Sequence, residues 1–385
     1  MATEIDIPLC DPDISKEDLL AVQKALSSPR LAHGPFVDAF EESFGAAIGC
    51  RYAISFASGA LAMLALLRAL GVGKDDEVVL PSLSWHQIGH TLALVGAKAV
   101  FADIDYWSGT LSPEKAKPKI TPKTKILMAG NTLGHPAPWE ALREMALENK
   151  LFLLEDSTEA IGSRFKGKSV GSFGDAAIFD FSTPQAITSG EGAMVVTDDE
   201  ALAREVRAWL GIEPEKRGVS VVDSGRVALQ AWMSEMQAAL GWSQVKRLSE
   251  ILERRAEVES WYGEEMQSFE GIKDPYRAPD VDAIYRPVYG VHMGTRFSHS
   301  ATRQIAEDLA AAGIEAKPYP PAMHRQRLYV PPGDEIPPLP KTDQIAPRLL
   351  ALPLHAHLCR EDVRLVVSAL KDAATNVGAG AAIYL

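Results

Sequence analysis

The chain has 385 residues, 46% of them hydrophobic and 23% charged, which is typical of a soluble globular protein with one large domain or two. Its formal net charge is −12 and no lysine or arginine cluster stands out, so we expect neither nucleic acid nor a membrane as a partner. No stretch approaches the ~20 apolar residues that span a bilayer, and the first residues do not resemble a signal peptide, so we expect a cytoplasmic protein.

Two amphipathic helices are predicted at the start of the chain. The first follows a helix cap formed by Ser15 and Asp18. Its predicted core face consists of Leu19, Val22 and Leu26. The second carries apolar residues at intervals of four, namely Phe36, Phe40, Phe44 and Ile48. We expect both apolar faces to pack on the core.

From residue 52 onward, short apolar strands alternate with helices. Strands are predicted at 52–56, 78–80, 99–102, 126–129, 151–154, 176–178 and 194–197. Helices are predicted at 61–70, 87–95, 139–148 and 200–210. This alternation predicts an α/β fold with a mostly parallel central sheet and flanking helices. Ligands of such sheets bind at the carboxyl ends of the strands.

The last third of the chain has a different pattern. A polar segment at 211–226 shows no periodicity, and a long helical block follows at 233–269. A strand at 288–291, a helix at 303–312, a proline-rich run at 318–340 and a last helix at 361–370 come after it. We therefore divide the chain into a large cofactor-type α/β domain with N-terminal helices, 1–245, and a long helix with a smaller C-terminal α+β domain, 246–385.

Four stretches that follow predicted strands could carry chemistry. Free N–H groups at the helix that starts near Gly59 can hold an anion or phosphate, because glycine allows close approach. Trp85, after the next strand, is either a stacking platform or a core aromatic residue. Asp156 ends a buried strand, where it could hold a cationic ring nitrogen or cap a turn. The loop at 182–192, with Gly190 and Gly192, joins two further strands.

Taken together, these stretches resemble the DegT/StrS-type sugar aminotransferases, which have the aspartate aminotransferase fold (fold type I of the pyridoxal phosphate enzymes). The resemblance runs from about residue 7 to residue 371 and includes the segments 58–62, 155–162, 166–175, 190–192, 233–241, 319–324 and 352–355. It implies pyridoxal phosphate or pyridoxamine phosphate as cofactor, a nucleotide-linked keto-sugar and an amino donor. It also implies a homodimer with sites at the subunit interface.

The resemblance assigns roles to individual residues. Asp156 matches the carboxylate that pairs with the pyridinium nitrogen, and Trp85 matches the aromatic residue that stacks on the cofactor ring. Gly59 and Ala60 match the phosphate-binding turn. The other matched cofactor positions are Glu159, Asp180, Gln185 and, from the partner subunit, Gln230. His324 is the candidate substrate contact, and no metal site is expected because Cys10, Cys50 and Cys359 lack ligand-like spacing.

Several of these positions depart from the family pattern. Gln185 stands where the family has the lysine that bonds to the cofactor and moves a proton, and an amide does neither, so we expect it to be inactive. Ala60, Asp180 and Glu159 replace a threonine, a serine and a glutamine. A carboxylate about 4 Å from a phosphate costs about 4 kcal/mol per pair of unit charges at an intermediate dielectric. Gln230 and Trp232 replace an asparagine and an arginine.

The departures leave four hypotheses open. The first is a protein of this fold whose transaminase site is altered or lost, with cofactor binding weakened or absent. The second is a non-catalytic binding subunit or pseudoenzyme that complements an active paralogue. The third is a true aminotransferase with an engineered Lys-to-Gln change at residue 185, which the departures at the neighbouring positions disfavour. The fourth is a dehydratase that uses the pyridoxamine form, with one of four histidines as its base: His86, His90, His135 or His324.

Overall fold

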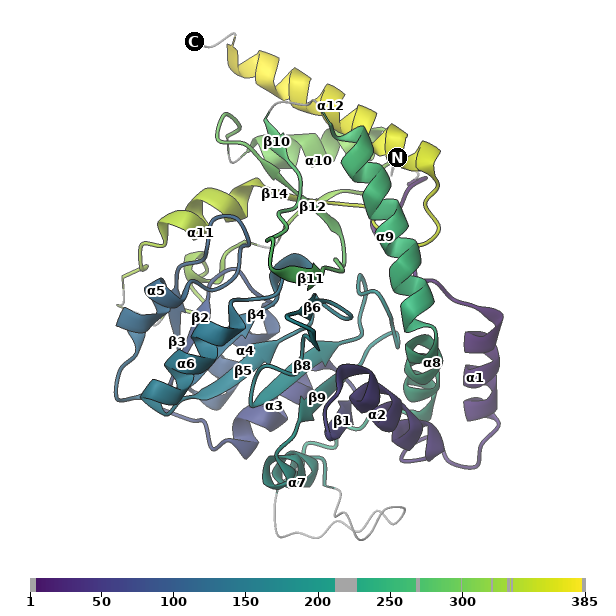
Figure 1. Ribbon diagram of the computed structural model, residues 1–385, viewed down its shortest axis with the longest axis vertical. Coiled ribbons are helices and arrows are strands. Elements are labelled where there is room, and N and C mark those ends of the chain that lie inside the picture. The colour runs from purple at the N-terminus through teal and green to yellow at the C-terminus, as the bar shows by residue number, and fades with distance from the viewer. Residues whose placement is uncertain are drawn as a thin grey trace.

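Two sheets of unequal size organise the molecule (Figure 1), and a third, of three short strands, lies between them. The computed structural model describes residues 5–211, 227–267, 271–298, 300–319, 321–330, 333 and 335–382. The predicted polar segment at 211–226 falls almost entirely outside the described residues. None of the described helices has the length and the apolar run needed to cross a bilayer.

The larger sheet has seven strands and matches the predicted alternation. In spatial order they are β1 (Tyr52–Phe56), β9 (Ala193–Thr197), β8 (Ala176–Asp180), β5 (Phe152–Asp156), β4 (Thr124–Gly130), β2 (Glu77–Pro81) and β3 (Lys98–Ala102). All of them run in one direction except β9, which is antiparallel to both of its neighbours. The predicted α/β fold with a mostly parallel sheet is therefore confirmed.

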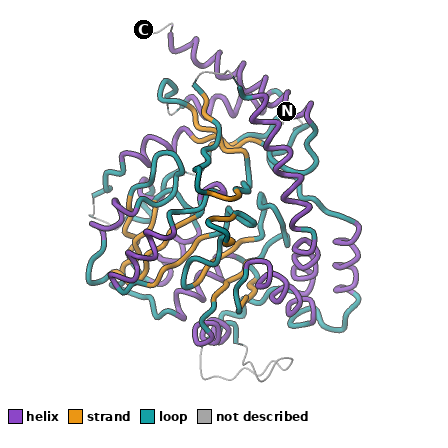
Figure 2. Tube along the Cα trace, viewed as in Figure 1, coloured by secondary structure: helices purple, strands orange, loops and turns teal. Residues whose placement is uncertain are grey.

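Helices cover both faces of this sheet, as Figure 2 shows for the orange strands and purple helices. The helices of this part are α2 (Pro35–Ile48), α3 (Gly59–Ala69), α4 (Gln87–Val95), α5 (Pro113–Ala116), α6 (Trp139–Asn149), α7 (Glu200–Trp209) and α8 (Glu235–Lys246). Side chains of α3, α4 and α7 share one apolar cluster with the strands, whereas α2 and α8 belong to a second and α6 to a third. The four predicted core residues of α2 are all buried.

The smaller sheet is antiparallel and lies in the upper part of Figure 1. Its strands, in order, are β10 (Ile272–Lys273), β12 (Tyr289–Met293), β14 (Leu349–Leu352) and β13 (Lys317–Pro318). The three-stranded sheet consists of β11 (Val281–Ala283), β6 (Arg164–Phe165) and β7 (Lys168–Ser169). Three helices join the strands of the smaller sheet or pack on them: α10 (Ala301–Ala311), α11 (Pro340–Ile345) and α12 (Arg360–Ala382).

The predicted helical block at 233–269 is two helices, because the chain bends at Arg247. The second helix, α9 (Leu248–Glu265), runs from the large sheet to the small one, where Val258 and Tyr262 join the core of the small sheet. Arg247 forms ion pairs of 3.1 Å with Asp13 and 3.0 Å with Asp18, so the bend also anchors the N-terminal segment. The division of the chain near residue 245 stays a prediction.

The first helix, α1 (Lys16–Leu26), has the predicted cap but not the predicted core face. Ser15 and Asp18 form a capping box. Leu19 and Leu26, however, are 63% and 56% exposed, and the buried positions are Asp18, Ala21 and Ala25. The physical reason is polar: Gln244 and Arg247 donate hydrogen bonds of 2.7 and 3.0 Å to Asp18, and this anchor turns the leucines outward.

Candidate functional site

The carboxyl ends of the parallel strands β1, β5 and β8 meet at one edge of the large sheet and bring several predicted residues together. Gly59 begins α3 directly after β1, and Asp180 ends β8. A Cβ atom on Gly59 would lie 2.3 Å from Asp180 Oδ2 and 2.5 Å from Cζ2 of Trp85. Only glycine fits at this position, because both side chains close directly over the start of the helix.

Asp180 places a carboxylate at the N-terminus of α3. The side chain is 5% exposed, and its Oδ1 accepts a hydrogen bond of 2.8 Å from the Ser182 N–H and another from the Ser182 hydroxyl. Burial raises the pKa of Asp180, while the Ser182 donors and the Gly59 N–H favour its charged form. Ser58, at the N-cap, makes no side-chain capping bond, so Asp180 is the acceptor that faces this positive helix end.

Asp156 is buried at the end of β5 and is supplied with donors by the protein. It accepts hydrogen bonds from the Thr158 N–H at 3.1 Å, the Thr158 hydroxyl at 2.7 Å and the Ser84 hydroxyl at 3.0 Å. Burial raises the pKa of Asp156, and the charge of Asp180 adds to the rise. Trp85 and Glu159 border the small space beside Asp156.

Glu159 is held by two donors from different parts of the fold. The Leu133 N–H donates a hydrogen bond of 2.8 Å to Oε2, and the Tyr319 hydroxyl donates to Oε1. Burial raises the pKa of Glu159 to about 7, although both hydrogen bonds lower it and the nearby charge of Asp156 raises it further. Tyr319 is a partner that the sequence motif 319–324 contained but that we did not single out.

Gln185 lies in the loop between β8 and β9. Its backbone N–H donates to the Ser182 carbonyl at 3.3 Å, and its half-buried side chain makes no hydrogen bond to any described residue. Gln185 lines a cavity of about 300 Å³ together with Cys10 and Arg255, a set that does not include Asp156 or Asp180. The structure thus groups Gly59, Asp180 and Trp85, and places the Gln185 side chain against the N-terminal segment.

The remaining predicted cofactor positions flank this group. Ala60 is the second residue of α3 and is half-buried. Gln230 is exposed and has a φ of 47°, just after the undescribed residues 212–226. Trp232 donates from Nε1 to the Leu210 carbonyl and packs edge-on against His33 at 4.0 Å between ring centroids. The roles of Ala60 and Gln230 at a cofactor stay predictions.

Each candidate histidine has a protein partner of its own. His324 is fully buried, with Nδ1 2.7 Å from the Ser82 hydroxyl and Nε2 3.1 Å from Asp343, and burial lowers its pKa. The others contact the Pro321 carbonyl at 2.9 Å (His86), the Tyr329 hydroxyl at 3.4 Å (His90), and the Pro136 carbonyl at 2.8 Å (His135). None of the four borders the space beside Asp156, and the substrate contact of His324 stays a prediction.

Sequence reasoning missed the donors that surround Asp156, and the signal for them was weak. Ser84 directly precedes Trp85, and Thr158 lies within the segment 155–162, but both are common residue types in turns. Among the described residues, no group of three His, Cys, Asp or Glu side chains could hold a metal ion.

Comparison with known proteins agrees with this architecture. Residues 12–371 match the family model of the DegT/DnrJ/EryC1/StrS aminotransferases. The chain is 32% identical to GDP-perosamine synthase of Caulobacter vibrioides over 342 residues, 88% of this chain and 90% of the relative. It is 29% identical to the spore coat polysaccharide biosynthesis protein SpsC of Bacillus subtilis over 381 residues, 95% of this chain and 96% of SpsC.

A solved structure leads to the same family. The aminotransferase TlmJ from Streptoalloteichus hindustanus superposes with a TM-score of 0.86 at 26% identity and covers 96% of this chain and 99% of its own. The resemblance of the motifs, the match over residues 12–371 and the shared fold have one explanation: the chain belongs to the DegT/DnrJ/EryC1/StrS aminotransferase family.

Proposed function

We propose that this chain is a member of the sugar aminotransferase family that no longer transaminates and that binds a nucleotide-linked sugar without converting it. The observation that carries the proposal is the Asp180 carboxylate at the start of α3, where the family resemblance locates the phosphate of the cofactor. A phosphate brought to that helix end would meet a negative charge instead of a hydroxyl donor.

The residues present do not fit pyridoxal phosphate. Trp85 and Asp180 both close on Gly59, at the helix end where the resemblance locates the phosphate of the cofactor. By the resemblance, the position of the cofactor-bonding lysine is Gln185, whose amide nitrogen is not nucleophilic. Asp156 accepts three hydrogen bonds from Ser84 and Thr158, two on Oδ1 and one on Oδ2, so only one of its acceptor sites remains for a ring nitrogen.

The ligand class is taken from the family. A relative at 32% identity is named GDP-perosamine synthase, which supports a nucleotide-linked sugar as the ligand of this chain. We also propose a homodimer, in which the exposed segment around Gln230 would face the partner subunit, as the resemblance implies. Thermal denaturation with GDP-, UDP- and TDP-linked hexoses would identify the nucleotide, and light scattering after gel filtration would measure the mass of the assembly.

The test of lost transamination uses four proteins: the natural chain, Gln185→Lys, Asp180→Ser and the double variant. After dialysis against pyridoxal phosphate, we expect the natural chain to retain no cofactor and to leave glutamate unconverted. We expect the double variant to retain cofactor that Gln185→Lys alone does not. Retention of one cofactor per chain by the natural protein would overturn the proposal, and recovery of glutamate turnover by Gln185→Lys alone would favour a laboratory substitution.

A second candidate function is a non-catalytic subunit of an active paralogue. Gln185 at the lysine position favours it as much as it favours a stand-alone binding protein. Purification of the chain from its native source decides between them. A second polypeptide of the same family in a fixed ratio supports the subunit role, whereas a single species counts against it.

A further inference from the structure

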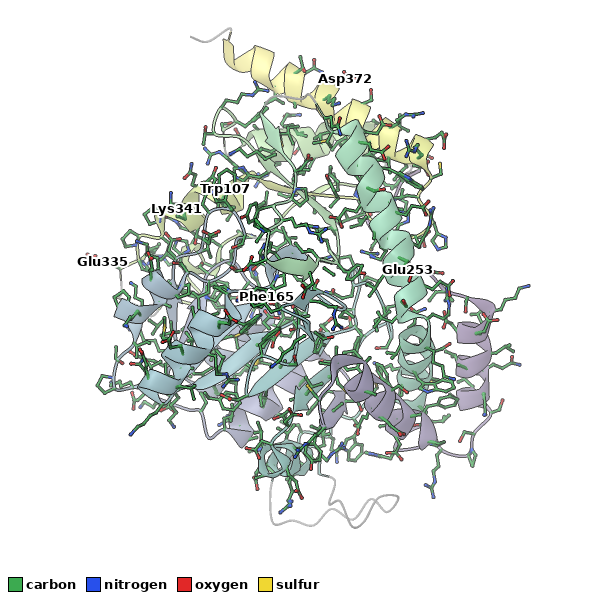
Figure 3. All side chains as sticks on the ribbon, in the orientation of Figure 1. Trp107, Phe165, Glu253, Glu335, Lys341 and Asp372 are labelled. Atoms are coloured by element: carbon green, nitrogen blue, oxygen red, sulfur yellow. The ribbon has the colours of Figure 1, made fainter. Side chains whose placement is uncertain are left out.

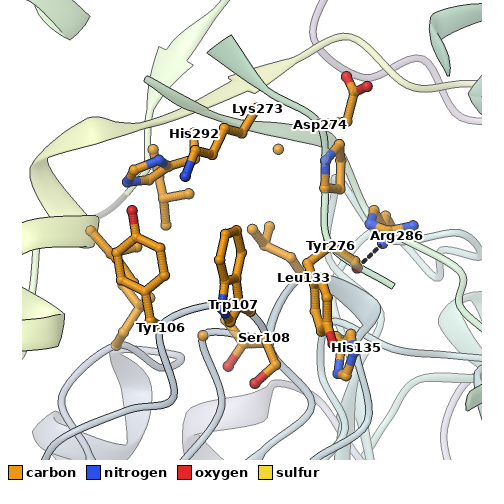
Figure 4. A pocket seen from close by; sticks show the side chains of 17 residues that line it. Tyr106, Trp107, Ser108, Leu133, His135, Lys273, Asp274, Tyr276, Arg286 and His292 are labelled. Atoms are coloured by element: carbon orange, nitrogen blue, oxygen red, sulfur yellow. Dashed lines mark hydrogen bonds between the residues drawn. The ribbon is translucent and has the colours of Figure 1, made fainter. Parts of the chain in front are cut away.

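A second cavity lies between the two larger sheets and has no part in the motifs that identify the family. It opens to solvent and spans about 740 Å³, a volume that includes the solvent at its mouth. Its floor consists of the loop after β3, at 106–109, and the loop after β4, at 132–135; its roof consists of β10 and β12 of the small sheet. Figure 3 places Trp107 at this boundary, and Figure 4 shows the cavity from close by.

Aromatic rings form the floor. Trp107 is 56% exposed and Tyr276 is 38% exposed, with their ring centroids 6.0 Å apart. Tyr106 meets Trp107 edge-on at 5.1 Å. Large side chains that stay this exposed at the mouth of a cavity contribute little to the core. The His135 ring stacks on one face of Tyr276 at 5.6 Å and Lys273 lies over one face of Trp107, so the opposite faces are the ones that can meet an apolar surface such as the C–H face of a sugar ring.

One cation in the cavity lacks a carboxylate partner among the described residues. The Lys273 ammonium lies 4.7 Å above the Trp107 ring and 5.4 Å above that of Tyr106. Arg286 is paired with Glu259, and Asp274 accepts a hydrogen bond of 3.1 Å from the Tyr289 hydroxyl. The Lys341 ammonium lies 5.4 Å from the centre of the Tyr106 ring and adds positive charge at this edge of the cavity. In Figure 4, the Asp274 carboxylate points away from the aromatic rings, so Lys273 dominates the charge over the floor.

Two polar atoms that line the cavity are buried without a hydrogen-bond partner. They are the hydroxyl of Thr132, a residue only 4% exposed, and Nε2 of His292, which lies opposite Lys273 in the pairing of β10 with β12. Burial and the charges of Lys273 and Arg348 lower the pKa of His292 to about 4, so its imidazole is neutral near pH 7. A buried polar atom without a partner is costly, and a ligand hydroxyl would satisfy each of them.

We propose that this cavity binds an acidic sugar, a pyranose that carries a carboxylate. The carboxylate pairs with Lys273, the ring lies on Trp107 and Tyr276, and ring hydroxyls bond to Thr132 and His292. A neutral sugar would leave the ammonium without a counter-ion, and a planar aromatic acid would leave the Thr132 hydroxyl and the imidazole nitrogen unsatisfied. Thr132 also borders the space beside Asp156, but Trp107, Lys273 and His292 do not. Binding of the sugar at these residues does not require a cofactor beside Asp156.

Calorimetric titration of the full chain with D-glucuronate tests the proposal, with methyl glucoside and benzoate as the neutral and the planar comparison. We expect saturable binding of glucuronate that is stronger than that of either comparison. Lys273→Gln should weaken it about tenfold, since a charge-assisted contact is lost. Thr132→Val should weaken it about threefold or more, because a hydroxyl partner is removed at nearly constant volume. Lys115→Gln, the same exchange on the exposed surface of α5, should change nothing.

Each contrary outcome is decisive. Absence of saturable glucuronate binding, equal binding of methyl glucoside, tighter binding of benzoate, or an unchanged affinity in Lys273→Gln would each overturn the acidic-sugar site. Because these titrations contain no pyridoxal phosphate and leave residues 180 and 185 unchanged, their failure leaves the proposal of lost transamination untouched.

Discussion

The cleft at Asp180 and the cavity at Trp107 lie in the same fold but treat polar groups in opposite ways. In the cleft, Asp156 accepts three hydrogen bonds from the protein, and Asp180 and Trp85 close over the helix end at Gly59. In the cavity, Thr132 and His292 keep polar atoms without partners, and an ammonium lies over exposed rings. The polar groups at the family motifs are satisfied by the protein itself, whereas polar atoms in a place without motifs lack partners. Motifs therefore locate a site without showing that it can still bind.

The largest expected effect tests whether the Asp180 carboxylate blocks anions. Asp180→Ser should raise the affinity for inorganic phosphate about a hundredfold or more, because a repulsion of about 4 kcal/mol per pair of unit charges at 4 Å is removed. Calorimetric titration measures the change. Asp199→Ser, the same exchange at the N-cap of α7, is the control and should gain no comparable site. An unchanged phosphate affinity in Asp180→Ser would show that the cleft is closed for another reason.

A second prediction tests how tightly the cleft is packed. Gly59→Ala should destabilise the fold by about 2 kcal/mol, because the new methyl group would overlap Asp180 and the Trp85 ring. Gly263→Ala in α9 is the matched control: nothing lies within 4 Å of its Cβ position, and the change should stabilise by about 0.5–1 kcal/mol. Urea unfolding measures both variants. If Gly59→Ala and the unaltered chain are equally stable, Asp180 and Trp85 can move aside at little cost in free energy.

The buried carboxylates of the cleft predict how stability depends on pH. Glu159 titrates near 7 in the folded chain and near 4.5 when unfolded, so folding favours its protonated form. Its contribution is fully present below pH 4.5 and is lost as the pH rises through about 7. The raised pKa values of Asp156 and Asp180 act in the same direction.

Glu159→Gln should therefore reduce the decrease in the free energy of unfolding between these pH values by on the order of 2 kcal/mol. This figure is smaller than the full pKa shift would give, because the side chain is partly exposed. Urea unfolding at a series of pH values measures the slope. Glu114→Gln removes the same charge from the exposed surface of α5 and is the control. If the free energy of unfolding of Glu159→Gln falls with pH as steeply as that of the unaltered chain, Glu159 is not the titrating group.

The smallest expected effect lies in the open cavity. Trp107→Ala should change the free energy of unfolding by less than about 1 kcal/mol, because the ring is 56% exposed. Trp139→Ala, at 1% exposure, should cost about 3–5 kcal/mol. Thermal and urea unfolding separate the two. A large loss for Trp107→Ala would identify the ring as part of the core and weaken its assignment to a ligand surface.

Local pattern predicted most of the large sheet but little of the small one. Most strands of the large sheet contain buried, continuous apolar runs, which alternation with helices makes recognisable. Strands β10 and β13 have two residues each, too few for any periodicity to appear. The face of α1 was predicted wrongly because apolar spacing alone was weighed, whereas Asp18 is held by side chains more than 200 residues away.

The site shows the same limit. The motifs indicated Gly59, Trp85, Asp156 and Asp180 individually, because each follows a strand of the parallel sheet. Whether Asp180 faces the helix end depends on how β8 packs beside α3, which no local pattern reports. The aromatic cavity was missed altogether, since it joins the loop at 106–109 to residues such as Lys273 and His292 that come more than 150 positions later.

The carboxylate at the start of α3 also bears on how this lineage can evolve. On the proposed function, a return to amino transfer needs a lysine at residue 185 and removal of the charge at residue 180. A lysine at residue 185 alone would have no cofactor to bond. A serine at residue 180 alone would allow a phosphate to bind, but the chain would still lack the lysine that transfers the proton. Neither single replacement would restore amino transfer, so the Asp at the helix end makes a stepwise return to that activity difficult. Relatives of this chain that have Asp at the position of residue 180 should then lack the lysine at the position of residue 185, and they should form one branch of the family.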